Sequence, residues 1–393
     1  MRDARLPARA AWVEVDVAAI RHNLRVIRTL AGRARVYAVC KGHAYGFDAA
    51  TIARIAASEG IDALACGDPD DARCIRDAGI ALPILLYGST CSSALPALAA
   101  LDVTVTAHDA ATLETCVANG LAFSVKLDAG FNRLGFRESE LDVVEAAARA
   151  NRNCRPVGVY THLTDAEHAP LMAAQVERFL AMVARLEAAG WVGLERMVAS
   201  SRILIAAPDL ALDAVNPGRL VYGMLEPPWR DRVDARDALS AVKASIIALK
   251  PIVAGAALGY GGGMASRDSL LAVIPFGFGD GYPRFPAGGS VLVQGRRVPL
   301  LGPRHTEHSI VDVTGVPGVA LGDEVVLMGR QGSERIAIDE IVAATGVPLI
   351  ELLPRLAGAA SGRRVFIGDD ESACTAPAGS GRLHSTSPPW REQ

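Results

Sequence analysis

The strongest constraint on the fold is an alternation between short apolar runs and amphipathic segments from about Arg35 to Arg219. Six segments carry apolar residues at the i, i+3 and i+4 positions of a helix: 48–58, 69–77, 110–119, 139–150, 170–189 and 202–207. Eight apolar runs have the length of buried strands: 36–40, 63–66, 84–87, 103–106, 123–127, 157–160, 197–199 and 214–215. Strands that alternate with helices pair in parallel, and eight such units predict a TIM-type (β/α)₈ barrel, a fold of the α/β class.

After about Pro228 the pattern changes to β-like runs separated by Gly and Pro turns, which predicts a mostly-β second domain. These runs are 241–249, 269–274, 290–293, 297–300, 309–313 and 324–328, followed by a helical patch at 338–344 and a last strand at 363–367. We therefore expect a barrel domain over residues 1–232, of which residues 1–15 can pack on the second domain, and a β domain over 233–368. Ser, Pro, Gly, Ala and charged residues dominate 369–393, which predicts a disordered tail.

Composition excludes several classes of protein. The net charge is -3 in 393 residues and no Lys/Arg stripe stands out, which argues against a nucleic-acid partner and favours a small molecule. The N-terminus lacks the apolar core of a signal peptide and no stretch approaches a membrane span, so we expect a cytoplasmic protein. The 7 cysteines show no CxxC pair or His-linked spacing, which indicates neither disulfides nor a metal site.

Polar residues at the ends of the predicted strands are the candidates for catalysis, because barrel active sites lie at the carboxyl ends of the strands. Lys41 ends the first strand, where an apolar environment lowers the pKa of an amine and permits Schiff-base chemistry. Taken alone, a lysine at a strand end is more often a solvated loop residue. Further polar groups follow later strands, in the segment 126–136 and at His162, Ser201 and 216–218. Ser201 with Gly218 can bind a phosphate through hydroxyl and backbone N–H donors.

The β domain supplies three further candidate segments. Tyr260 stands in a glycine-rich loop, 259–263, that allows close approach to a ligand but lacks the spacing of a dinucleotide fingerprint. Taken alone, the segments 275–284 and 306–308 read as a turn-rich hairpin and a polar loop.

In this order, these segments resemble the alanine racemase family from Trp12 to Phe366. Residues 38–46 resemble its cofactor-lysine motif, 126–136 its Asp-Thr-Gly-Met-Asn-Arg-Leu-Gly signature, Tyr260 its catalytic tyrosine, and 276–284 its Gly-Tyr-Ala-Asp-Gly-Tyr segment. Residues 302–314 and 322–332 resemble its closing segments. The resemblance implies a barrel followed by a β domain, the cofactor pyridoxal 5′-phosphate (PLP), and a head-to-tail homodimer with shared active sites.

The resemblance also implies a role for each matching residue. Lys41 would carry PLP and act as the base on the D side, and the partner subunit's Tyr260 would act on the L side with help from His162. Arg133 would contact the phenolic oxygen of PLP and the substrate carboxylate. The remaining matches are Tyr45, Ser201 and Gly218 at the phosphate, Lys126 as a lysine often carbamylated in the family, and Tyr282 at the substrate entrance.

Several positions depart from the family pattern. Asn216 stands where the family has an arginine beside the pyridine nitrogen, so it offers a hydrogen bond without a fixed charge. Thr306 and Glu307 replace a Met-Asp pair, and Ser200 replaces an Asn, so the pocket is reshaped. The smaller hydroxylated side chain in place of methionine favours a substrate larger or more polar than alanine. The tyrosine expected before the last strand is missing, and Arg219 is placed to compensate at the phosphate.

The main hypothesis is therefore a PLP-dependent racemase, an isomerase, that acts on alanine or a related small or polar amino acid. The first alternative is a PLP decarboxylase of the same barrel type, which requires an acidic partner for the pyridine nitrogen and a catalytic cysteine late in the chain; neither is seen. The second is a PLP-binding protein without turnover, suggested by Asn216, Thr306 and Glu307.

Overall fold

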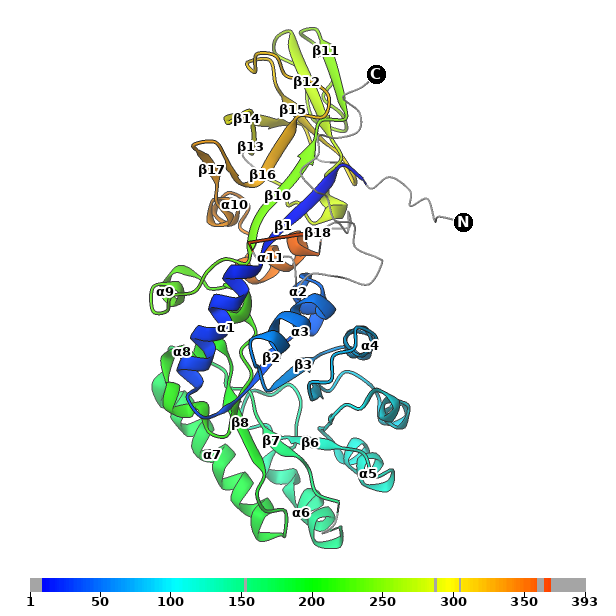
Figure 1. The fold of residues 1–393 in the computed structure, drawn as a ribbon, viewed down its shortest axis with the longest axis vertical. Coiled ribbons are helices and arrows are strands. Elements are labelled where there is room, and N and C mark those ends of the chain that lie inside the picture. The colour runs from blue at the N-terminus through cyan, green and yellow to red at the C-terminus, as the bar shows by residue number, and fades with distance from the viewer. Residues whose placement is uncertain (1–8, 152–153, 286–287, 304, 359–363, 369–393) are drawn as a thin grey trace. The chain divides into compact units, whose positions relative to one another are not determined.

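The computed structural model describes residues 9–151, 154–285, 288–303, 305–358 and 364–368, which form two compact units. The barrel unit consists of Ala19–Ala44 and Asp48–Arg236. The β unit contains the described parts of Met1–Ala18, Tyr45–Phe47 and Asp237–Gln393 (Figure 1).

The barrel unit is built on an eight-stranded parallel sheet of order β4-β3-β2-β9-β8-β7-β6-β5. Its strands are β2 (Arg35–Val39), β3 (Ala63–Cys66), β4 (Ile84–Leu86), β5 (Val105–Ala107), β6 (Phe123–Lys126), β7 (Gly158–Tyr160), β8 (Glu195–Ala199) and β9 (Ala214–Val215). A parallel bridge between Leu85 and Thr104 connects the two ends of this order, so the sheet closes. The predicted (β/α)₈ barrel is confirmed, with a strand at each of the eight expected positions.

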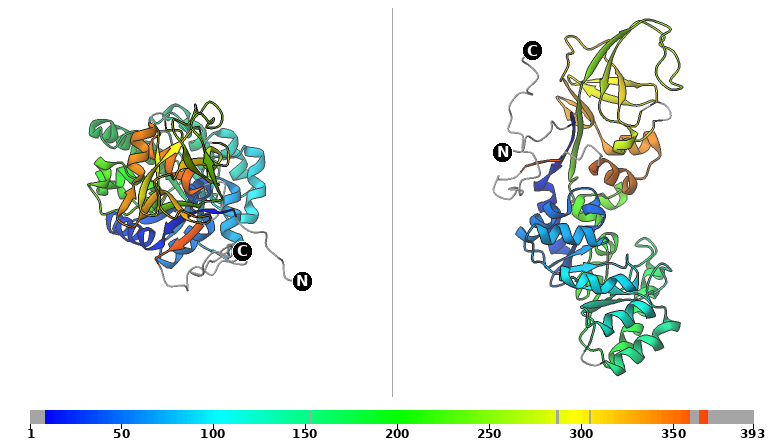
Figure 2. Two further views of the ribbon diagram at one scale, coloured as in Figure 1. Left: turned by 90° about the horizontal axis from the view of Figure 1, so that it is seen from above. Right: turned by 90° about the vertical axis from the view of Figure 1, so that its right-hand side faces the viewer.

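Helices alternate with these strands, and Figures 1 and 2 show them around the sheet. They are α1 (Val17–Ala31), α2 (Lys41–Tyr45), α3 (Ala49–Ser58), α4 (Pro69–Asp77), α5 (Ala110–Ala118), α6 (Leu141–Ala150), α7 (Ala169–Ala188), α8 (Ser201–Ala206) and α9 (Pro227–Arg230). Local sequence determines where several helices begin. The side chains of Asp48, Asp68 and Asp109 each accept a backbone N–H in the first turn of the helix that follows. Between β4 and β5 the chain forms a 3₁₀ helix, η1 (Ser92–Leu101), which contains Pro96.

The β unit is a ten-stranded sheet that includes the first strand of the chain. Its strands are β1 (Ala11–Asp16), β10 (Leu239–Ser245), β11 (Ala248–Ile252), β12 (Ser269–Ile274), β13 (Ser290–Val293), β14 (Arg296–Leu301), β15 (Ser309–Asp312), β16 (Glu324–Gln331), β17 (Glu334–Ile336) and β18 (Arg364–Ile367). β1 pairs antiparallel with β10 and parallel with β18. The second domain is therefore mostly β, as predicted.

The structure differs from the sequence prediction in a few elements of the β unit. The run 241–249 is not one strand, because Ile246 donates its N–H to Asp323 and Ile247 donates to Val273, so the chain changes partners there. The helix α11 (Leu349–Ala357) follows α10 (Ile338–Thr345) and was not predicted; it buries Leu352 and Leu356. The expected tail 369–393 lies outside the described residues.

Candidate active site

Lys41 stands at the carboxyl end of β2, immediately before a left-handed turn. Gly42, His43 and Ala44 have φ of 61°, 53° and 57°. Left-handed backbone costs an L-residue about 1–2 kcal/mol, so His43 and Ala44 are strained. Buried Asp71 holds the turn, because its two carboxylate oxygens accept the His43 N–H at 3.0 and 3.2 Å. Strain of this kind is typical of functional sites, and here it fixes the backbone next to the lysine.

The electrostatic environment connects Lys41 to residues at the ends of three other strands, β6, β7 and β9. Burial lowers the pKa of the Lys41 amine, and Arg133 and Arg219 lower it further. Burial also lowers the pKa of His162 to about 3, with added repulsion from Lys126, Arg133, Lys41 and Arg219. His162 is therefore a neutral imidazole at physiological pH, and the barrel mouth gathers these predicted site residues in one region.

Lys126 is a buried residue at the end of β6. Burial, followed by repulsion from Arg133, lowers its pKa to about 7 despite the opposing attraction of Asp128. Its Nζ lies 4.4 Å from the centre of the Tyr160 ring. A large share of the amine is therefore unprotonated near neutral pH, and only an unprotonated amine is nucleophilic.

The loop after β6 presents Arg133. Oδ1 of Asp128 accepts the N–H groups of Gly130, Phe131 and Asn132 at 3.0, 2.8 and 3.0 Å, which gives the loop a defined path. The Arg133 guanidinium lies 4.5 Å from the centre of the Phe131 ring, and that ring meets His162 edge-on at 4.9 Å. The loop therefore places an arginine beside the histidine that follows β7.

Asn216, after β9, has a partner that the sequence analysis did not single out. Its Nδ2 donates a hydrogen bond of 3.1 Å to the hydroxyl of Tyr87, which follows β4. The Tyr87 ring lies 5.9 Å from that of Tyr160, whose hydroxyl is 2.9 Å from Thr106 Oγ1. The signal for Tyr87 was present in the sequence, since a hydroxyl-bearing aromatic ends the apolar run 84–87.

Ser201 is hydrogen-bonded to the backbone shortly after Gly218, and an arginine follows each of these two residues. Ser201 Oγ accepts the N–H of Leu220 at 3.0 Å, which ties the start of α8 to the 3₁₀ helix η4 (Arg219–Tyr222). The following residues, Arg202 and Arg219, both reach Oε1 of Glu226, at 2.7 and 2.9 Å. Arg202 and Glu226 were also missed from sequence, because neither lies at a strand end.

The remaining predicted site residues belong to the β unit. Tyr260 is 86% exposed, and its ring lies 5.6 Å from His305. A Cβ on Gly262 would come within 2.0 Å of the Leu258 carbonyl oxygen, so the loop depends on glycine there. Thr306 and Glu307 are exposed, whereas Tyr282 is buried against Phe276 and Phe285. Tyr45, with φ of 53°, clusters with this unit rather than with the barrel.

The charges at the barrel mouth suit an anionic group that reacts with an amine. Four cations, Lys41, Lys126, Arg133 and Arg219, are electrostatically coupled to His162. Asp128 attracts Lys126 and Glu226 pairs with Arg219, and Asp128 is already engaged by three backbone N–H groups. Thr161 Oγ1 is also buried without a hydrogen-bond partner among the described residues. An aldehyde cofactor that carries a phosphate and a phenolic oxygen fits this donor set.

The barrel, the β unit and this lysine site define a PLP-dependent enzyme. The model of the alanine racemase N-terminal domain matches residues 15–226, and that of the C-terminal domain matches residues 239–363. The alanine racemase of Thioalkalivibrio sulfidiphilus is 37% identical over 363 residues, which cover 89% of this chain and 97% of that protein. The alanine racemase of Aeromonas hydrophila is 34% identical over 361 residues, which cover 88% and 97%.

Solved structures give the same result. The alanine racemase of Bacillus anthracis, with bound L-Ala-P, superposes with a TM-score of 0.83 at 28% identity, and the match covers 93% of this chain and 97% of that chain. The chain belongs to the alanine racemase family and is an isomerase. Among the described residues, no helix combines the length and the apolar character needed to span a membrane.

Proposed function

We propose that this enzyme interconverts the L and D forms of alanine or of a related small or polar amino acid, with PLP held at the barrel mouth. The observation that carries the proposal is the amine of Lys41, whose pKa is lowered by burial and by Arg133 and Arg219. When bound, PLP supplies the electron sink that makes the α-proton of an amino acid acidic. The protein must then bind the amino acid, orient it and move its α-proton.

Lys41 performs two tasks in this proposal. Its lowered pKa leaves more of the amine unprotonated, so Nζ would hold the cofactor and would accept or return the α-proton on one face. The strained turn held by Asp71 restricts the backbone that carries it.

The opposite face requires a second base, and we assign it to the partner subunit's Tyr260. High exposure of this side chain in a single chain fits a residue that functions against another subunit. The same assembly brings the partner subunit's Thr306 and Glu307 to the substrate, and their exposure fits that role. The active form is then a homodimer.

The remaining roles follow the geometry of the barrel mouth. Arg133, held over Phe131, binds the substrate carboxylate and the phenolic oxygen of the cofactor. Neutral His162 supplies a hydrogen bond without adding a charge to an already cationic site. Ser201, the Gly218 backbone and Tyr45 bind the phosphate, and Arg219 strengthens the attraction from its place beside Glu226. Tyr282, which packs against Phe276, is assigned to the substrate entrance.

The Asn216 amide faces the cofactor ring nitrogen in this arrangement. Because its Nδ2 is bonded to the Tyr87 hydroxyl, the pair presents neutral hydrogen-bonding groups. Decarboxylases of this barrel type need an acidic group there, so the Asn216–Tyr87 pair favours racemisation.

The experiment is incubation of the PLP-loaded enzyme with L-alanine in D₂O, followed by NMR and chiral chromatography. We expect α-deuterated alanine of both configurations, and the Lys41→Ala variant should lose both the reaction and the visible absorption of lysine-bound cofactor. Release of CO₂ would indicate a decarboxylase, and cofactor binding without exchange would indicate a protein that only holds PLP. Serine and other small amino acids, tested in parallel, establish the substrate range.

A further inference from the structure

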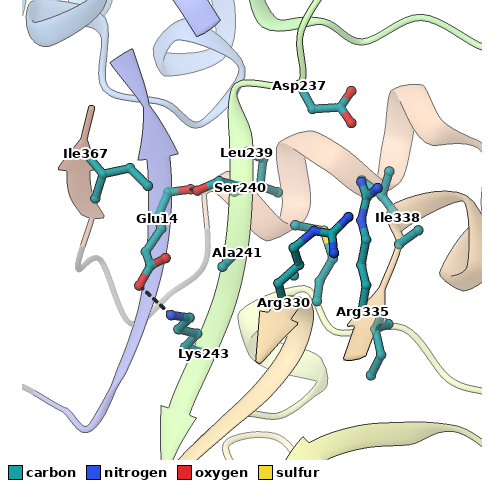
Figure 3. A pocket seen from close by; sticks show the side chains of 14 residues that line it. Glu14, Asp237, Leu239, Ser240, Ala241, Lys243, Arg330, Arg335, Ile338 and Ile367 are labelled. Atoms are coloured by element: carbon teal, nitrogen blue, oxygen red, sulfur yellow. Dashed lines mark hydrogen bonds and ion pairs between the residues drawn. The ribbon is translucent and has the colours of Figure 1, made fainter. Parts of the chain in front are cut away.

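The β unit contains a cavity of about 380 Å³ that has no part in the proposed reaction. Figure 3 shows its lining, which comes from β1, β10, β16, β17, β18 and the start of α10. Every lining residue belongs to the β unit, so the cavity is a property of this domain.

Two arginines dominate the charge of this cavity. Arg330 of β16 and Arg335 of β17 are directly opposite each other in the antiparallel pair, and both are exposed. Figure 3 shows their guanidinium groups on the same side of the hairpin. Among the described residues, neither guanidinium has an acidic partner or a hydrogen bond. Like charges directly across a sheet repel, so this arrangement costs stability that an anion between them would recover.

The other charged groups of the lining do not neutralise this pair. Glu14 is bonded to Lys243 at 2.9 Å, and Lys243 is also paired with Glu324 at 3.2 Å. Asp237 also lines the cavity, and its carboxylate is not a free group.

Apolar groups form the rest of the surface. Four buried apolar side chains line the cavity: Leu239, Met328, Ile336 and Ile338. Gly329, next to Arg330, has φ of +116°, and a Cβ there would lie 2.8 Å from that of Ala241, so the backbone approaches β10 more closely than a larger residue allows. The cavity thus combines an apolar wall with two guanidinium groups.

We propose that this cavity is a binding site for a small organic anion, one with an apolar body and a phosphate or carboxylate group. The two guanidinium groups hold the anionic group by charge-assisted hydrogen bonds, and Leu239, Met328, Ile336 and Ile338 contact the body. The site is separate from the residues assigned to racemisation, so it stands whether or not that assignment holds.

The test is a titration of the PLP-loaded enzyme with the fluorescent anion 8-anilinonaphthalene-1-sulfonate. We expect saturable binding that is weakened about tenfold or more in the Arg330→Ala/Arg335→Ala double variant. Arg296→Ala is the matched control, because Arg296 is an exposed arginine on β14 of the same domain, outside the cavity. Since the double variant loses a repulsive pair, its melting temperature should equal or exceed that of the parent.

Competition identifies the anionic group. Displacement of the probe by inorganic pyrophosphate alone assigns a phosphate ligand, displacement by succinate alone assigns a carboxylate ligand, and displacement by both supports the general class. The proposal is overturned if neither anion competes, if the double variant binds the probe as tightly as the parent, or if Arg296→Ala weakens binding equally.

Discussion

At the scale of single residues, the buried amine of Lys126 has the most direct chemical consequence. With a pKa lowered to about 7 by burial and Arg133, this amine can add to CO₂, forming an N–C bond and releasing a proton. The resulting carbamate is an anion, so Arg133, which repels the ammonium form of Lys126, would attract the carbamate.

We therefore predict a carbamate on Lys126 that increases as the pH rises through about 7, because protonation below this pKa removes the nucleophile. The measurement is ¹³C NMR of the enzyme equilibrated with ¹³C-bicarbonate. The signal should disappear in Lys126→Met and persist in Lys243→Met. Burial lowers the pKa of Lys243, but the carboxylates of Glu14 and Glu324 outweigh this effect and raise it. A signal unaffected by Lys126→Met would place the carbamate elsewhere.

A second residue-scale prediction concerns Tyr87. Tyr87→Phe removes the acceptor of the Asn216 Nδ2 hydrogen bond, which should lower kcat/KM for alanine about fivefold, corresponding to roughly 1 kcal/mol, and shift the absorption of the bound cofactor. Asn216→Ala should cause a similar change, and the double variant little more than either single variant. Additive effects would show that the two residues act independently.

Site residues could be predicted from sequence where they follow strands. Residues that only hold other site residues in place could not. Lys41, Arg133 and His162 follow predicted strands, and the structure gathers them. Glu226, which joins Arg202 to Arg219, follows no strand and has no motif, so only the folded chain shows its contacts. The roles of Tyr45, Tyr260, Thr306 and Glu307 remain predictions.

At the scale of elements, the left-handed turn after β2 depends on Asp71 in α4. Asp71→Ala removes the acceptor of the His43 N–H, which should lower the free energy of unfolding by about 1–3 kcal/mol and weaken cofactor affinity. Asp68→Ala is a control on the same helix: it removes an N-cap and costs about 1 kcal/mol without touching the turn. Denaturant unfolding and PLP titration measure both effects; equal loss of PLP affinity in the two variants would contradict the role of the turn.

The elements themselves were predictable where apolar periodicity decides them. All eight barrel strands were expected, because each is a short apolar run between polar segments. The break between β10 and β11 was not, since Ile246 and Ile247 continue an apolar pattern while the hydrogen-bond partner changes from Asp323 to Val273. Pairing of this kind depends on residues distant in sequence, which periodicity does not report.

At the scale of the whole molecule, the proposed sharing of active sites between subunits predicts complementation between two inactive variants. A Lys41→Ala chain and a Tyr260→Phe chain each lack one base, yet a mixed dimer has one site with both. Co-expression in equal amounts should restore about a quarter of the parent activity, because half of the dimers are mixed and each has one intact site. Activity no higher than that of the separate variants would show that both bases come from one chain.

β1 has a consequence for synthesis of the chain. β1 (residues 11–16) lies between β10 and β18. It is therefore synthesised well before its two partner strands, at 239–245 and 364–367. During translation the barrel segment can collapse first, while this early strand retains unsatisfied edges until the last strand emerges. Shortening the chain before residue 364 should therefore leave β1 with one open edge and favour aggregation over soluble product.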